Sequence, residues 1–249
     1  MAGEIADNQG RGGVPWTLPP IHPEGRRLGL IPAALGVLAI LFGWSVLGVL
    51  LLIASCAVFA FFRDPARVVP QDDSAILAPA DGIVTQIVRE VPAEELRLAD
   101  GSDIEGLTDT PVIRVSIFLS MFDVHINRAP IGGILRRLIY LPGSFASAEL
   151  DKASKENERQ YYLIERPDGV KVGLTQVAGL IARRLVSFAK VGDTMAAGQR
   201  FGMIRFGSRV DVWLPDGTDA QVLLGQRCIA GETVIGRLKQ QRLIEGVRQ

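Results

Sequence analysis

Apolar residues are concentrated near the amino terminus of the chain. From Leu28 to Phe62 no residue carries a charged side chain, and the stretch is rich in Leu, Ala, Ile and Val. A membrane-spanning helix needs about 20 such residues, and one straight helix of this length would be much longer than the hydrocarbon layer. The pattern therefore predicts a membrane-associated helical segment over 28–62, broken near Gly43-Trp44-Ser45 into a tight hairpin or a re-entrant wedge.

The charges on either side of this segment predict its orientation. Arg26 and Arg27 precede it, and Arg63 and Arg67 follow it. Positive charge is favoured on the cytoplasmic side of a membrane, so both ends of the segment, and the remainder of the chain at 63–249, are expected to face the cytoplasm. A buried helix of a soluble core is the alternative, but such helices rarely lack charges for so long. Residues 1–27 show no hydrophobic period and are expected to form a flexible leader.

Residues 63–249 contain short runs rich in β-branched and aromatic residues, such as 112–118 and 161–164. Turn signals such as Pro79-Ala80-Asp81-Gly82 and Pro215-Asp216-Gly217 separate the runs. This alternation predicts a mainly β fold (β-rich α+β) with sandwich-like or barrel-like sheets. Helix candidates are few, and they are Ala93–Leu98, Ser147–Lys155 and Gln176–Leu185.

Charge and cysteine content exclude several classes of protein. The chain has 27 Lys and Arg against 27 Asp and Glu, so no basic surplus exists to neutralise nucleic-acid phosphates. Its two cysteines, Cys56 and Cys228, are too few for a disulfide framework. Neither their number nor their spacing supports a zinc site. We therefore expect no nucleic-acid partner and no metal.

Candidate proton-transfer chemistry is confined to a few residues. The chain has two histidines, and because His22 lies in the leader, imidazole chemistry in 63–249 must use His125. If 121–130 were a strand, Asp123, His125 and Asn127 would share one face. A histidine with a purely structural hydrogen bond is the alternative. Asp81 sits in a tight turn, where Asp-Gly is also an ordinary turn pair.

Three Gly-Ser pairs occur, and none has the Gly-x-Ser-x-Gly pattern of a hydrolase elbow. They are Gly101-Ser102, Gly143-Ser144 and Gly207-Ser208. The third pair lies in an expected β segment, where glycine weakens a strand unless a bulge or a close backbone approach requires it. The chain also lacks a Walker loop and a dinucleotide fingerprint.

Six separated blocks of the sequence match one enzyme family in order. They are FFRDP (61–65), PADG (79–82), DVHINRAP (123–130), DKASKENER (151–159), AGLIARR (178–184) and GQRFGMIRFGSR (198–209). On these blocks, residues from about 61 to 237 resemble the short, prokaryotic type of phosphatidylserine decarboxylase. An apolar segment directly before the first block is also similar to the family.

The resemblance implies a self-processing lyase. It places the cleaved bond at Gly207-Ser208, which divides the chain into 1–207 and 208–249, and it converts Ser208 into a covalent pyruvoyl group. The catalytic Asp and His positions of the family fall on Asp81 and His125. The pyruvoyl group would form a Schiff base with the amine of phosphatidylserine, whose decarboxylation gives phosphatidylethanolamine, with His125 protonating the carbanion.

The resemblance also implies that the two chains stay together as a heterodimer at the cell membrane, with the catalytic domain facing the cytoplasm. Cations for the acidic substrate are expected among four arginines, which are Arg128, Arg183, Arg184 and Arg209.

Two other functions remain open. One is a pyruvoyl-dependent decarboxylase acting on another amine. The other is a non-catalytic, membrane-tethered binding module, because 191–194 and 230–233 are similar to the turns of biotinyl/lipoyl-like domains. Such modules usually carry a lysine at a hairpin tip, and no lysine stands between these turns.

Overall fold

The computed structural model describes residues 17–97, 106–143, 157–179, 184–205, 208–242 and 244–247. The chain divides into two compact units, Met1–Val68 and Val69–Gln249. The flexible leader expected at 1–27 falls largely outside the described residues, which begin at residue 17.

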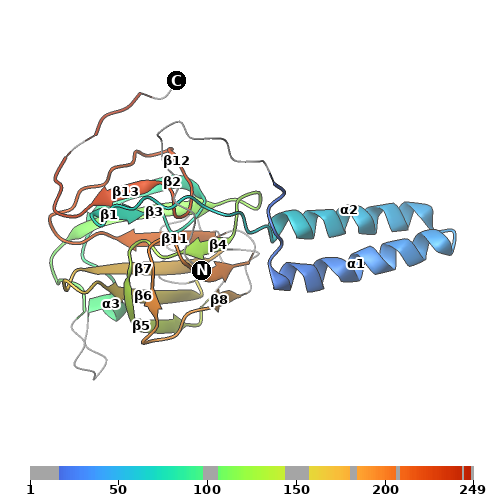
Figure 1. Cartoon of the computed structure of the whole chain (residues 1–249), viewed down its shortest axis with the longest axis horizontal. Coiled ribbons are helices and arrows are strands. Elements are labelled where there is room, and N and C mark those ends of the chain that lie inside the picture. Colours follow the sequence, from blue (N-terminus) through green and yellow to red (C-terminus); the bar gives the residue numbers. More distant parts are fainter. Residues whose placement is uncertain are drawn as a thin grey trace. The chain divides into compact units, whose positions relative to one another are not determined.

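The first unit contains two antiparallel helices, α1 (Pro23–Leu41) and α2 (Ser45–Phe61) (Figure 1). His22 caps α1, because its Nδ1 accepts a hydrogen bond of 3.4 Å from the backbone N–H of Glu24. The chain reverses at 42–44, where Gly43 has a φ of +86°, a conformation that favours glycine. The two backbones approach closely at Gly36 and Gly48, since a Cβ added to Gly48 would lie 2.6 Å from the Gly36 carbonyl oxygen.

Both helices expose large apolar side chains, including Leu30, Leu35, Leu50 and Ile53. Among the helices in the described part of the chain, none has both the length and the hydropathy needed to cross a membrane. The membrane association of 28–62 therefore stays a prediction.

The second unit is built mainly from antiparallel strands (Figure 1). Among the described residues its main sheet has eight strands in the order β12-β2-β3-β11-β7-β6-β5-β9. In that order the strands are β12 (Arg227–Cys228), β2 (Gly82–Glu90), β3 (Val112–Leu119), β11 (Ser208–Trp213), β7 (Lys171–Ala178), β6 (Arg159–Glu165), β5 (Gly133–Leu141) and β9 (Thr194–Met195).

Two smaller sheets and one short helix complete the described part of this unit. One sheet has the order β4-β10-β8, and the other pairs β1 with β13. Their strands are β4 (Ile126–Arg128), β10 (Arg200–Ile204), β8 (Leu185–Ser187), β1 (Ala75–Leu77) and β13 (Val234–Arg237), and the helix is α3 (Glu94–Arg97). The prediction of a mainly β fold is confirmed.

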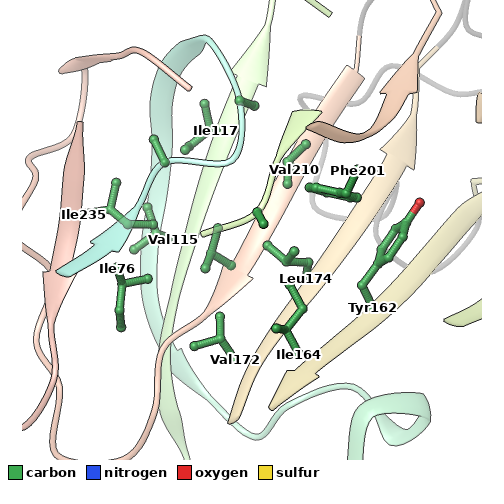
Figure 2. Packing of buried hydrophobic residues seen from close by; sticks show 14 of the residues in the cluster. Ile76, Val115, Ile117, Tyr162, Ile164, Val172, Leu174, Phe201, Val210 and Ile235 are labelled. Carbon is green, nitrogen blue, oxygen red and sulfur yellow. The ribbon is translucent and has the colours of Figure 1, made fainter. Parts of the chain in front are cut away.

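The main hydrophobic core collects fully buried side chains from strands of all three sheets, as Figure 2 shows for Ile76, Leu174, Phe201 and Val210. The aromatic rings of Tyr162 and Phe201 meet edge to face at a centroid distance of 4.7 Å. A smaller cluster on the other face of the main sheet contains Leu96, Val112, Tyr161, Leu163 and Trp213.

The three helix predictions had different outcomes. The helix expected at Ala93–Leu98 is present as α3. The candidate at Ser147–Lys155 lies outside the described residues. The candidate at Gln176–Leu185 is wrong, because β7 continues to Ala178 and β8 begins at Leu185. β7 lies between β11 and β6, and pairing with both neighbours holds 176–178 in an extended conformation whatever their local helix propensity.

Candidate functional site

The residues singled out in the sequence gather at one end of the main sheet. Ser208 is the first residue of β11, and it pairs with Leu119 at the end of β3 and with Ala178 at the end of β7. At the same end, Ile83 near the start of β2 pairs with Phe118, the neighbour of Leu119. Asp81 directly precedes β2, and His125 follows β3 by six residues. The pairing therefore brings the predicted serine, histidine and aspartate segments together.

Ser208 is completely buried, and its Oγ has no hydrogen-bond partner among the residues that the structure describes. An orphaned buried hydroxyl costs about 1–3 kcal/mol and requires an explanation. Its side chain shares a face of β11 with Val210 and Val212, which belong to the main core. Gly207, the other half of the proposed cleavage site, lies outside the described residues.

His125 is buried, and its backbone is tied to the segment that leads to Ser208. The backbone N–H of Ile204, four residues before Ser208, donates to the His125 carbonyl oxygen at 3.2 Å. The imidazole Nδ1 lies 2.9 Å from the backbone carbonyl oxygen of Asp123. Because a carbonyl can only accept, Nδ1 carries the proton in the neutral ring, and Nε2 has the lone pair of a base.

Asp81 is held in a turn that only glycine can follow. Gly82 has a φ of +154°, and a Cβ there would lie 2.1 Å from the Phe118 carbonyl oxygen. The Asp81 Oδ1 accepts a hydrogen bond of 2.8 Å from the backbone N–H of Ala230. Burial, and next the charge of Asp81, raise the pKa of the Cys228 thiol to about 12. The Asp81 carboxylate therefore acts electrostatically on the buried Cys228 thiol at this end of the sheet.

Asp123 is not placed as a strand at 121–130 would place it. β4 begins only at Ile126, and Asp123 closes a turn in which its N–H donates to the Ser120 carbonyl oxygen at 3.0 Å. Its Oδ2 accepts hydrogen bonds from the backbone N–H and the hydroxyl of Ser120 at 2.8 and 2.7 Å, and its Oδ1 accepts from Arg227. The prediction that Asp123, His125 and Asn127 share one face of a strand is therefore wrong, because Asp123 lies in a turn and not in a strand.

A buried chain of hydrogen bonds, which sequence reasoning missed, supports the segment around His125. The Tyr162 hydroxyl donates to Gln176 Oε1 at 3.0 Å, and Gln176 Nε2 donates to Asn127 Oδ1 at 2.7 Å. Asn127 Nδ2 in turn donates to the carbonyl oxygen of Pro79, two residues before Asp81, at 3.4 Å. These hydrogen bonds join β6 and β7 to β4, which directly follows His125, and to the turn that contains Asp81. They hold both segments on the sheet.

The four candidate substrate-binding arginines lie in different surroundings. Arg128 is buried, and its Nη1 donates to the Gly198 carbonyl oxygen at 3.0 Å. Arg184 is exposed, and its carbonyl oxygen accepts from the N–H of Arg205, three residues before Ser208. Arg183 lies outside the described residues.

Arg209 faces away from the Ser208 side chain, because neighbours on a strand point to opposite faces. Its guanidinium forms a buried ion pair with Asp211, with an Nε–Oδ1 distance of 2.9 Å. A cavity of about 600 Å³ lies on this opposite face, lined among others by Arg114, Asp211 and Trp213. The structure therefore does not bring Arg209 or this cavity together with Ser208.

Two further polar residues that sequence reasoning missed hold Ala178, the strand partner of Ser208. Asn157 is fully buried, and its Nδ2 donates to the carbonyl oxygen of Ala178, the strand partner of Ser208, at 2.7 Å. The carbonyl oxygen of Glu158 accepts from the N–H of Ala178 at 2.9 Å. The signal was present in the sequence, because both residues belong to the block at 151–159.

Comparisons with known proteins identify the family. A family model described as phosphatidylserine decarboxylase matches residues 56–236. The chain is 56% identical over 249 residues to a phosphatidylserine decarboxylase proenzyme of Novosphingobium aromaticivorans, covering 100% of this chain and 99% of the relative. Relatives with the same description from Erythrobacter litoralis and Zymomonas mobilis are 53% and 49% identical and cover 100% and 98% of this chain, and the same shares of their own length.

The matches extend over nearly the whole length of the chain and of its relatives. The resemblance found in the sequence is confirmed, and the chain belongs to the phosphatidylserine decarboxylase family.

Proposed function

We propose that this chain decarboxylates phosphatidylserine to phosphatidylethanolamine with a pyruvoyl group that it makes from Ser208 by cutting itself at Gly207-Ser208. Membership of the family supports the reaction. The structural observation that supports the residue assignment is the buried Ser208 Oγ, which has no hydrogen bond within the described part of the chain and lies at the sheet end that also carries His125 and Asp81. An unbonded hydroxyl has no partner to lose when it attacks a neighbouring carbonyl carbon.

The self-cleavage assigns a role to each residue. His125 accepts the proton of Ser208 Oγ, and Asp81 stabilises the imidazolium that results. The oxygen attacks the Gly207 carbonyl carbon, and the bond between this carbon and the Ser208 nitrogen breaks, leaving an ester. Loss of the Cα proton then breaks the Cβ–O bond and releases the Gly207 carboxylate. The remaining dehydroalanine takes up water and loses ammonia, which leaves a pyruvoyl group at residue 208.

The surroundings of Ser208 fit this product. The pyruvoyl group has a methyl carbon where serine carries its hydroxymethyl group, so its formation removes the orphaned hydroxyl and places an apolar methyl against Val210 and the main core. When formed, the group supplies an electron sink for the electron pair that remains when CO2 leaves the substrate. We assign to His125 the return of a proton to the substrate carbon, and to Arg128 and Arg184 the contact with the substrate's anionic groups.

The strand arrangement supports a stable complex of the two product chains. β11, β12 and β13 follow the cut, whereas their partners β3, β7, β2 and β1 precede it. All six residues of β11 are buried. Burial of Val210, Val212, Leu214 and Ile235 alone contributes about 6–12 kcal/mol to holding 208–249 in place. We therefore propose that the two chains remain a heterodimer.

We also propose that the enzyme works at the cell membrane with its catalytic unit on the cytoplasmic side. Its two-chain lipid substrate resides in the bilayer, and the exposed apolar side chains of α1 and α2 suit contact with lipid. The arginines at both ends of 28–62 support the cytoplasmic orientation.

The reaction can be tested on the purified full chain with phosphatidylserine dispersed in detergent. We expect release of CO2 and formation of phosphatidylethanolamine, both abolished by borohydride in the presence of substrate. A chain that cuts itself but decarboxylates only soluble amino acids would instead identify a pyruvoyl enzyme for another amine. A chain that neither cuts itself nor releases CO2 would favour the binding module, whose expected turns contain Gly192 and Gly231, both with positive φ.

A further inference from the structure

The turn between β3 and His125 has an apolar tip. Ser120 and Asp123 are the ends of this turn, and the two residues between them are Met121 and Phe122. The exposed fractions of these residues are 50% for Met121 and 86% for Phe122. Tips of solvated turns usually carry Gly, Asn, Asp, Ser or Pro, because these residues suit the backbone and bind water. Two large apolar residues at this position therefore need an explanation.

The exposure is imposed by the structure of the turn. Asp123 is buried, and its carboxylate holds Ser120 through both the backbone N–H and the hydroxyl. Arg227 of β12 holds the second carboxylate oxygen. The turn is thus fixed at its base by a buried, fully bonded acid, and its apolar tip is held outward.

The turn belongs to the sheet end that carries the candidate site. Leu119, directly before Ser120, pairs with Ser208, and the Asp123 carbonyl oxygen accepts from His125. Two more partly exposed apolar residues, Ile83 and Ile229, adjoin Arg227 and Cys228 in the β2–β12 pair. The apolar tip, the exposed guanidinium of Arg227 and the reacting segment therefore occur together at this sheet end.

We propose that Met121 and Phe122 insert into the surface of a phospholipid bilayer and hold the sheet end that carries Ser208 against the lipid headgroups. The proposal rests on the proposed function, because a site that acts on a bilayer lipid has to face the bilayer. A two-residue tip is far smaller than the roughly 800 Å² per partner of a stable protein interface, but it suits insertion between lipids. Arg227 beside it complements anionic headgroups.

A second turn of the chain provides a matched control. In 190–193, the N–H of Asp193 donates to the Lys190 carbonyl oxygen at 3.0 Å, and the N–H of Lys190 donates to the Asp193 carboxylate at 2.8 Å. The tip residue Val191 is 57% exposed. Backbone hydrogen bonds join this turn to Leu135 of β5. Leu135 lies six residues, about 20 Å, from Leu141, which is at the end of β5 nearest the candidate site.

The direct test places a tryptophan at each tip of the full chain, as Phe122→Trp and Val191→Trp. Vesicles of phosphatidylcholine and phosphatidylserine with brominated acyl chains quench a tryptophan that enters the lipid. We expect Phe122→Trp to be quenched more than the unchanged chain. Val191→Trp should be quenched no more than the unchanged chain. Equal quenching of the two variants would overturn the proposal. This readout requires no decarboxylation, so it is independent of the proposed function.

A kinetic test compares Phe122→Ser with Val191→Ser. Exposing a polar in place of an aromatic side chain weakens membrane contact, so we expect Phe122→Ser to lose about tenfold or more in rate on phosphatidylserine vesicles. Its self-cleavage and its rate on detergent-dispersed phosphatidylserine should match those of Val191→Ser. An equal loss on vesicles and in detergent would contradict the proposal, and so would no loss on either. Absence of activity of the unchanged chain in detergent would instead refute the proposed function.

Discussion

Substitutions of Asp81 and Asp123 should have opposite effects, because the Asp81 carboxylate is assigned to self-cleavage and the Asp123 carboxylate to holding a turn. Asp123→Asn keeps one oxygen that can still accept from Ser120, but its amide nitrogen faces the guanidinium of Arg227. One charge-assisted hydrogen bond is lost, which is worth about 1.5–3 kcal/mol when buried. Arg227 has a side chain that is 61% exposed and can turn to water, so we expect a loss of only about 1–2 kcal/mol.

The two variants are separated by measuring stability and self-cleavage on the same preparations. For a unit of this size, the loss in Asp123→Asn lowers the midpoint of thermal unfolding by about 3–6 °C, while self-cleavage goes to completion. Asp81→Asn retains an oxygen that can accept from Ala230, so its unfolding midpoint should change little. Its self-cleavage should slow by about 10³–10⁴-fold, as in other sites that lose the carboxylate behind a histidine. Fast cleavage of Asp81→Asn with blocked cleavage of Asp123→Asn would refute the assignment.

Three more predictions follow from the site. His125→Ala should abolish self-cleavage, seen as a single band on a denaturing gel, because no other imidazole lies in 63–249; two bands would exclude His125 as the base. Gln176→Leu leaves the buried Oδ1 of Asn127 without its donor and removes one partner of the Tyr162 hydroxyl, which also bonds Ser187, so the free energy of unfolding should fall by about 1–3 kcal/mol in thermal or urea unfolding, and an unchanged value would show that these hydrogen bonds are not stabilising. Because burial raises the pKa of the Cys228 thiol to about 12, thiol reagents at pH 8 should leave Cys228 unmodified in the native protein and modify it after denaturation; equal labelling of native and denatured protein at Cys228 would contradict this burial.

The β class and much of the site could be predicted from local sequence. Runs such as 112–118 have the β-branched character of a strand, and turn residues such as Asp81-Gly82 separate them, so the elements follow from local chemistry. The six family blocks directed attention to Ser208, His125 and Asp81. The strand pairing then explains why residues so far apart in sequence lie at one sheet end.

The remaining features depend on tertiary contacts that no local pattern contains. Gln176 was expected to begin a helix, but pairing of β7 with β11 and β6 makes it part of a strand. Its role appears only when Asn127 of β4 and Tyr162 of β6 are brought to it. Asp123 was expected on the same strand face as His125, because residues two apart share a face only if the backbone is extended. The turn that Asp123 closes with Ser120 is fixed by Arg227, more than 100 residues away in the sequence.

Mass measurement of the purified full chain under denaturing conditions distinguishes a self-cleaved protein from an uncut one. Self-cleavage at Gly207-Ser208 gives two masses, one for residues 1–207 and one for 208–249. The second is lighter than the encoded peptide by the mass of one ammonia, because Ser208 has become a pyruvoyl group. Ser208→Ala should give one mass, that of the uncut chain, whereas Ser102→Ala and Ser144→Ala should give the same two masses as the unchanged protein. A single mass for the unchanged chain, a cut at another bond, or a cut in Ser208→Ala would show that Ser208 does not become the pyruvoyl group.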